Sequence, residues 1–219
     1  MYKIERKTYA GVPVNYSEVI RYAGAKSGDE NLNSLIESCV SESEKENAIN
    51  FAVCFAELPI KIKGDETDFS AFTLKSKNLA VALRGANSAL VFACTVGIKT
   101  DRLIAKYSAI DPLRALIFQA LGAERVETYT DFFIDDFEKT RGAKLSPRFS
   151  AGYGDLPLSA QKDVFNLLNP QKYLGLTLNH SLLMSPSKSI TAFAGINCEN
   201  AAEKLSCKDC AKRDCAYRR

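Results

Sequence analysis

The chain has 219 residues, of which 46% are hydrophobic and 25% charged, so it can bury a core and is not disordered along its whole length. Its 29 basic and 26 acidic side chains leave a net charge of +3, which gives no reason to expect nucleic acid or an anionic membrane as partner. The N-terminus lacks an apolar signal segment and no uncharged stretch reaches the ~20 residues that span a bilayer, so we expect a cytoplasmic protein.

The N-terminal half mixes helical and strand patterns. Loose alternation over residues 3–14 predicts a strand, and Asn15 with an acid three residues later predicts a helix that ends near Gly24. A second amphipathic helix is expected from about residue 32 to 40, with the charged segment 41–50 as its continuation.

Short apolar runs dominate the next part of the chain. Segments 51–62, 69–74 and 79–83 are β-prone, and each predicts a strand. The nearly continuous apolar run 88–96 predicts a buried central strand.

The longest helix is predicted at about 111–141. Asp111 followed by Pro112 combines a capping side chain with a proline at the first helical position, and Gly142 supplies a stop. Apolar residues recur at helical spacing between them. Gly122 lies inside this helix, where glycine costs ~1 kcal/mol relative to alanine, so it indicates close packing at that point.

The C-terminal half begins with a segment rich in glycine and proline at 147–157, followed by a short helix from Ser159. Strands are expected at 175–184 and 189–196, paired as a hairpin around a turn at 185–188. Because strands and helices alternate without a βαβ rhythm, we predict a single α+β domain over 1–197, with a twisted, mainly antiparallel sheet and flanking helices.

The segment Arg148 to Tyr153 carries groups suited to a small polar ligand. Arg148 presents a planar fork that matches a carboxylate, and Gly152 lets the backbone of Ser150 and Ala151 approach a base edge. Tyr153 offers a hydroxyl and a π-face to a cationic sulfonium. S-adenosylmethionine has all three matching groups. The alternative is a structural loop with an arginine ion pair and a core tyrosine.

The residues that follow carry a family resemblance. The segment 148–155, the helix start at 156–161 and the turn from Met184 to Ser189 together resemble the activation (reactivation) domain of cobalamin-dependent methionine synthase. In that family Arg-x-x-x-Gly-Tyr is the S-adenosylmethionine motif. The resemblance covers roughly the second half of the chain, and extends more weakly upstream through 92–97 and the long helix.

The resemblance implies roles for individual residues. Arg148 would hold the methionine carboxylate, the backbones of Ser150 and Ala151 would meet the adenine, Gly152 would permit that approach, and Tyr153 would lie near the sulfonium.

Two positions outside the motif bear on the same resemblance. Glu127 on the long helix is a candidate for one of the family's acidic residues, whereas the family's C-terminal tyrosine has no clear counterpart. His180 stands where the family commonly carries an acid. A single histidine beside an apolar strand is predicted to be a satisfied core residue, the alternative being a pH-sensitive contact to a partner.

The chain lacks the Asp-x-His-x-x-Gly cobalamin motif, a dinucleotide fingerprint and a P-loop. Cobalamin is therefore expected only on a partner, either a methionine synthase or another corrinoid methyltransferase. A one-electron reductant would reduce Co(II) to Co(I), and this chain would present S-adenosylmethionine for the methyl transfer that reactivates the cofactor.

Four of the seven cysteines crowd into a tail at 198–219, separate from the domain: Cys198, Cys207, Cys210 and Cys215. Four thiolates at such spacing suit zinc or an iron–sulfur cluster, with metal-free reactive thiols or an inert tail as alternatives. The other three are predicted to be buried reduced thiols: Cys39, Cys54 and Cys94.

Two further functional hypotheses stay open. One is a redox or metal-binding module whose nucleoside site is vestigial. The other is a scaffold that docks a corrinoid protein without binding S-adenosylmethionine.

Overall fold

The computed structural model describes residues 2–25 and 28–197. The four predicted tail ligands, Cys198, Cys207, Cys210 and Cys215, lie outside the described residues. The helices are α1 (Tyr16–Tyr22), α2 (Glu30–Lys45), α3 (Lys77–Ala82), α4 (Ile98–Ile110), α5 (Pro112–Arg141), the 3₁₀ turn η1 (Leu158–Ala160), α6 (Gln161–Leu168) and α7 (Pro170–Leu174). The strands are β1 (Glu5–Tyr9), β2 (Phe51–Pro59), β3 (Lys61–Lys63), β4 (Glu66–Asp68), β5 (Thr73–Lys75), β6 (Ser88–Thr95), β7 (Thr177–Leu178), β8 (Met184–Ser185) and β9 (Ser189–Ile196).

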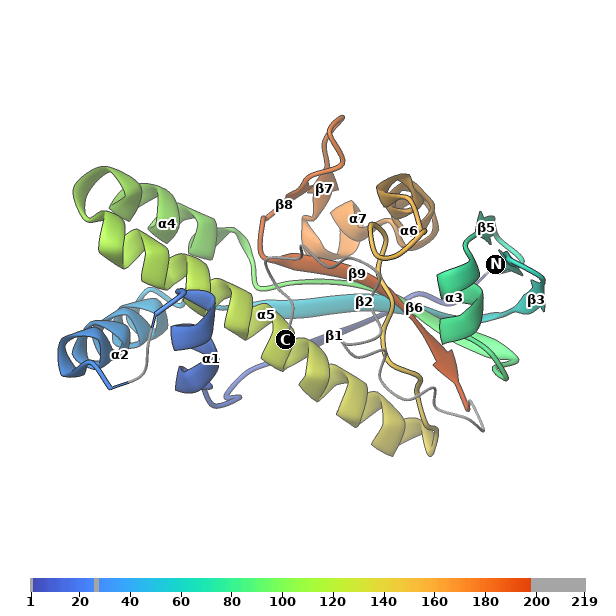
Figure 1. Ribbon diagram of the computed structural model, residues 1–219, viewed down its shortest axis with the longest axis horizontal. Helices are drawn as coiled ribbons and strands as arrows, with labels where there is room; N and C mark the ends of the chain where they lie inside the picture. Colours follow the sequence, from blue (N-terminus) through green and yellow to red (C-terminus); the bar gives the residue numbers. More distant parts are fainter. Residues whose placement is uncertain (1, 26–27, 198–219) are drawn as a thin grey trace.

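A four-stranded antiparallel sheet in the order β1-β2-β6-β9 forms the centre of the molecule (Figure 1). Its long inner strands are buried on both faces. Along β2, Phe51, Val53 and Phe55 contribute to one core and Cys54 and Ala56 to another. This double burial explains the nearly continuous apolar runs, because a strand covered on both faces has no polar side. The predicted central strand at 88–96 is confirmed.

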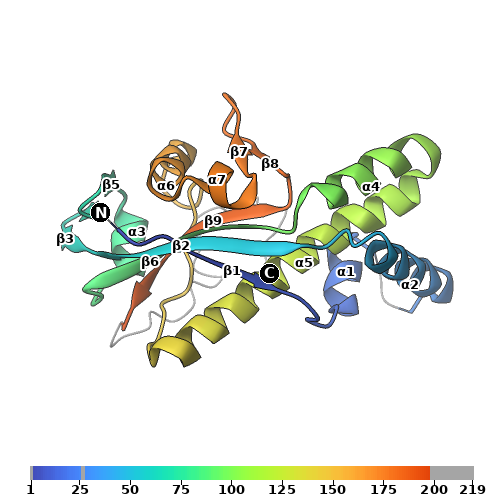
Figure 2. The ribbon, with the colours of Figure 1, turned by 180° about the vertical axis from the view of Figure 1, so that it is seen from behind.

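The helix α5 crosses one face of this sheet, and α6 and α7 cover the other (Figures 1 and 2). Phe133 of α5 is fully buried, with its ring centroid 5.2 Å from that of Phe55 and 5.4 Å from that of Phe92. Asp111 accepts the N–H of Arg114 at the start of α5, and Gly142 ends the helix in the left-handed conformation. The boundaries predicted for this helix are therefore confirmed.

The first half of α5 belongs to a third core, shared with α1, α2 and α4. Gly122 makes the closest approach in this region. A Cβ there would lie 2.8 Å from Cγ2 of Thr100 on α4 and 3.0 Å from Cγ of Lys188. The close packing expected from a glycine inside a helix is confirmed.

Three local predictions are wrong. The segment 69–74, predicted as a strand, is a strand only at its last two residues, where β5 begins. The segment 79–83, predicted as a strand, lies largely in α3, because the Ser76 hydroxyl accepts the N–H of Leu79 and caps a helix there. The predicted hairpin of 175–184 with 189–196 does not form: β7 pairs with β8, while β9 pairs with β6 in the central sheet. The apolar faces of β9 are buried by joining the central sheet, which a two-stranded hairpin could not achieve.

The predicted class, a single α+β domain with antiparallel strands and one long helix, is confirmed. Cys39, Cys54 and Cys94 are buried and free, as expected, and burial raises the pKa of each thiol. Among the described residues, no helix has the length and hydropathy needed to cross a membrane.

Candidate functional site

The segment that carries Arg148 lies along the free edge of β9. The N–H and C=O of Phe149 exchange hydrogen bonds of 2.8 Å with Phe193, and the Ser146 N–H donates to the carbonyl of Gly195. Phe149 is buried in the core, so the neighbouring Arg148 side chain is turned away from it. The extended backbone thus fixes the direction in which the guanidinium leaves the sheet.

A tight turn follows directly. The Tyr153 N–H donates to the carbonyl of Ser150 (3.2 Å) and the Gly152 N–H to that of Leu156 (3.0 Å), with Gly152 at φ +87°. Ala151 is buried, and no hydrogen bond within the described residues uses its N–H or C=O. Tyr153 is 67% exposed. The alternative of a core tyrosine at this position is therefore wrong, and the ring is accessible to a ligand.

The far end of the turn is held by α3. The Asp155 carboxylate accepts the Ser76 hydroxyl (2.5 Å) and the N–H groups of Lys77 (2.8 Å) and Asn78 (3.1 Å). The bond from Ser76, with those from the two N–H groups, lowers the pKa of the Asp155 carboxyl. The turn is thus fixed at both ends, between β9 and the first turn of α3.

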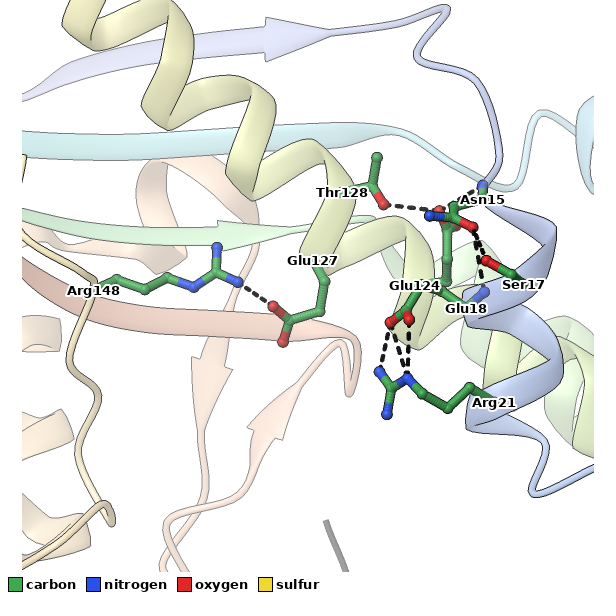
Figure 3. Close-up of polar contacts among 8 residues, drawn as sticks. All are labelled: Asn15, Ser17, Glu18, Arg21, Glu124, Glu127, Thr128 and Arg148. Carbon is green, nitrogen blue, oxygen red and sulfur yellow. Dashed lines mark hydrogen bonds and ion pairs between the residues drawn. The ribbon is translucent and has the colours of Figure 1, made fainter. Parts of the chain in front are cut away.

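Arg148 faces two carboxylates on α5, and Figure 3 shows the one of Glu127. Its guanidinium forms ion pairs with Glu127 and with Asp131, the latter at 2.8 Å. These acids are four residues apart and so lie on one face of the helix. A guanidinium has five N–H donors, and these two bonds leave three of them for another acceptor. The Arg148 side chain is 25% exposed, so those donors are accessible from solvent.

The helix α1 lies beyond Glu127 (Figure 3). Arg21 forms an ion pair with Glu18 (2.6 Å), and its guanidinium carbon lies 4.1 Å from the ring centroid of Tyr22. Burial raises the pKa of Tyr22, and the negative charge of Glu127 adds to that rise. The packing of α1 against α5 places this helix next to the acids of α5.

Sequence reasoning named Arg148 and Glu127 but missed Asp131 and Tyr22. The signal for Asp131 was present, since it follows Glu127 by four residues on a helix whose boundaries were predicted correctly. The sequence carried no signal for Tyr22, whose position beside the site depends on the packing of α1 on α5.

Asp131 and Tyr153 are mostly exposed, so the site opens to solvent. Two hollows of about 730 and 390 Å³ occur elsewhere, one beside β3 and α3 and the other beside the N-terminal residues and α6, and neither is lined by residues 148–153. His180 is exposed on the loop after β7, so the prediction of a core histidine is wrong. Within residues 2–25 and 28–197, no group of three or more His, Cys, Asp or Glu side chains could hold a metal ion.

No protein-family model and no curated protein matches the chain. It is similar in structure to the MetH reactivation domain crystallised with AdoHcy, with a TM-score of 0.66 and 14% sequence identity, over 93% of this chain and 81% of that one. At this identity the likeness shows the fold. The predicted resemblance to the methionine synthase reactivation domain is thus confirmed for the fold of the chain.

Proposed function

We propose that this chain binds S-adenosylmethionine on the surface formed by Arg148–Tyr153 and the acids of α5, and supports the reductive methylation of cobalamin on a partner. The observation that carries the proposal is the Arg148–Glu127–Asp131 group, exposed at the edge of the sheet. The fold shared with a reactivation domain that binds AdoHcy supports it independently.

The charges of Arg148, Glu127 and Asp131 match those of the amino-acid part of S-adenosylmethionine. The three remaining N–H donors of Arg148 suit the α-carboxylate, while the partly exposed carboxylates of Glu127 and Asp131 suit the α-ammonium. A ligand that carried only a carboxylate would gain nothing from the two acids. The arrangement therefore favours a zwitterion over a simple anion.

The turn after Arg148 suits the rest of the ligand. The unpaired backbone groups of Ala151 and the N–H of Ser150 can meet a purine edge, and Gly152 adopts the positive φ that the turn requires. Tyr153 offers an exposed ring to the sulfonium. The residues present therefore offer a partner to each of three parts of S-adenosylmethionine: the amino-acid head, the adenine and the sulfonium.

The cobalt would be held by a partner, a methionine synthase or another corrinoid methyltransferase, and reduced by a separate one-electron donor. S-adenosylmethionine would supply the methyl group to the reduced cobalt of the partner and would leave as S-adenosylhomocysteine. The contribution of this chain is to bind and orient the donor on an open surface that a second protein can approach.

The test is calorimetric titration with S-adenosylmethionine. We expect binding in the micromolar range or weaker. It should be lost in Arg148→Ala and weakened in Arg148→Lys, because lysine keeps the charge but lacks the planar guanidinium that binds a carboxylate through two hydrogen bonds. Arg102→Ala is the matched control, because Arg102 is exposed on α4 away from the motif. Absence of binding to the wild-type chain at millimolar ligand would refute the proposal.

A second measurement tests the proposed methyl transfer to cobalamin on a partner protein. A corrinoid protein that lacks a reactivation domain, held at Co(II) with a chemical one-electron reductant, should give the methylcobalamin spectrum only when this chain and S-adenosylmethionine are both present. Equal methylation with the Arg148→Ala variant would contradict a role for this surface.

A further inference from the structure

A second surface lies far along the sheet from α2, where β3 and α3 stand together in both ribbon views (Figures 1 and 2). A hollow of about 730 Å³ opens there. One wall is β3 and the turn after it, and the other is α3 with the connection to β6 at residues 84–87. The function proposed above uses none of these side chains.

The first wall presents an unpaired strand edge. The Ile60 N–H donates to the carbonyl of Asn87 (3.0 Å), on the side of the hollow. Backbone N–H groups two residues apart on a strand point to the same edge. The Ile62 N–H is therefore also directed toward the hollow. Lys61 and Lys63 pair with β4 on the opposite side. The strand β3 is the outermost of the order β3-β4-β5. Its free edge therefore offers main-chain hydrogen bonds to an added strand.

The second wall is basic at its ends and apolar between them. Lys77, Ala80, Val81 and Arg84 follow the spacing i, i+3, i+4, i+7 and line the hollow together. Lys61 adds a third positive charge from β3. Within the part of the chain that the structure describes, Lys61, Lys77 and Arg84 have no carboxylate within ion-pair distance.

The lining contains a single acid, Asp65, and that carboxylate is already paired with Lys75 at 3.7 Å. The hollow thus has three unpaired cations around an apolar strip. Its charge is complementary to an acidic occupant, and its apolar strip to a side chain without charge.

We propose that this groove binds an extended acidic segment of a partner protein, which adds as a strand to the free edge of β3. The edge supplies main-chain pairing, the apolar strip of Ala80 and Val81 takes an apolar side chain, and Lys61, Lys77 and Arg84 take flanking carboxylates. A phosphorylated small molecule fits less well, because the three cations are exposed and separated by apolar surface.

The probe is a fluorescently labelled peptide in which aspartate or glutamate alternates with valine, titrated with the full chain and followed by anisotropy. We expect binding that weakens about tenfold in Arg84→Glu. Lys139→Glu is the matched control: it reverses an exposed charge on α5, outside the hollow, and should leave the affinity unchanged. Hydrogen exchange at the Ile62 amide should slow when the peptide is bound.

Two altered peptides test the mode of binding. The peptide with lysine at every acidic position, and the acidic peptide N-methylated at alternate amides, should both fail to bind, because one reverses the charge and the other removes the strand donors. Equal binding of either peptide would overturn the proposal, as would displacement of the acidic peptide by inorganic pyrophosphate at similar concentration.

The groove and the Arg148 surface are distinguished by one further variant. Arg148→Ala should bind the peptide as the wild type does, whether or not S-adenosylmethionine binds at Arg148. Loss of peptide binding in that variant would place the peptide on the other surface and overturn the assignment to β3.

Discussion

Gly122 lies on α5 where three segments of the chain pack closely. A Cβ there would contact Thr100 on α4 and Lys188, the residue before β9. Thr100 is buried, and its hydroxyl donates to the carbonyl of Ala48, so its methyl group has little freedom to move. A glycine in a helix is unfavourable by itself, so its presence here reflects the space between α4 and α5.

We expect Gly122→Ala to lower the free energy of unfolding by up to about 2 kcal/mol. The gain in helix propensity is ~1 kcal/mol, and overpacking a tight contact typically costs ~1–3 kcal/mol. Urea denaturation measures the change. The double variant with Thr100→Ser keeps the hydroxyl, removes the crowding methyl group, and should recover most of the loss. A more stable Gly122→Ala variant would show that α4 can move away freely.

The affinity for S-adenosylmethionine tests the proposed roles of Glu127 and Asp131. If they hold the α-ammonium of S-adenosylmethionine, Glu127→Gln should weaken binding about tenfold, since a hydrogen bond to a charged group contributes ~1.5–3 kcal/mol. Calorimetry gives the affinity. The chemical control is 5′-methylthioadenosine, which has no amino-acid head and should bind both proteins equally.

An equal loss for both ligands would mean that Glu127 maintains the shape of the surface as a whole, because 5′-methylthioadenosine has no carboxylate for Arg148 to hold. A loss for S-adenosylmethionine alone fits two roles, contact with the ammonium or positioning of Arg148. Asp131→Asn then separates the two roles. It removes the more exposed of the two acids and should leave the Glu127–Arg148 pair in place.

At the scale of elements, the contact between α3 and the turn after Arg148 links the two halves of the sequence. Asp155 lies 77 to 79 residues from its three donors, and the same carboxylate supplements the Ser76 cap of α3. Gly154 is part of this contact, because a Cβ there would lie 2.6 Å from Nδ2 of Asn78. The turn that holds Tyr153 therefore depends on a helix from the other half of the chain.

We expect Asp155→Ala to destabilise the fold by about 0.5–1 kcal/mol, at the low end for a lost cap because the carboxylate is exposed. Amide exchange should rise at both Lys77 and Tyr153. Unchanged exchange at Tyr153 would show that the turn keeps its shape without α3.

The same carboxylate predicts a pH dependence. Its pKa is lowered in the folded chain, so its stabilising contribution is present above the ordinary value of 3.8 and is lost as pH falls through the lowered pKa. The difference in unfolding free energy between wild type and Asp155→Ala should therefore shrink below pH 3.8. A difference that stays constant across that range would contradict the assignment.

Elements whose boundaries are set by nearby residues could be predicted from the sequence, whereas pairings that depend on distant residues could not. The helix α5 could be placed to within a residue, because Asp111, Pro112 and Gly142 act locally. The strand β9 was found but paired wrongly, because its partner β6 lies about a hundred residues away. For α3, the cap at Ser76 was overlooked, and short apolar runs do not distinguish a helix from a strand.

The candidate site shows the same division. Arg148 and Tyr153 are visible as a motif, and Glu127 and Asp131 as a helical pair. Their meeting, however, requires α5 to cross the sheet in front of β9, which no local pattern specifies. Open surfaces are also harder to foresee than cavities, because nothing in the composition of the segment 148–153 predicts whether Tyr153 is buried or exposed.

At the scale of the whole molecule, the N-terminal segment is joined to α5 by a buried ion pair. Glu124 and Arg125 are 1% and 2% exposed, and their side chains pair at 2.5 and 2.7 Å. Arg125 also donates to the carbonyls of Val12 and Pro13, and Glu124 accepts the N–H of Asn15 (2.9 Å). The connection between β1 and α1 is thus held by adjacent residues at the middle of the longest helix.

We expect Arg125→Leu to lower the free energy of unfolding by about 3–5 kcal/mol, because it leaves the buried Glu124 carboxylate without its cation. Adding Glu124→Gln should recover part of this loss, since an amide carries no charge and can still accept the Asn15 N–H. Urea denaturation of the two single variants and the double variant measures the coupling between them. A loss below about 1 kcal/mol in Arg125→Leu would mean that water reaches Glu124, and that the connection between β1 and α1 is held by other contacts.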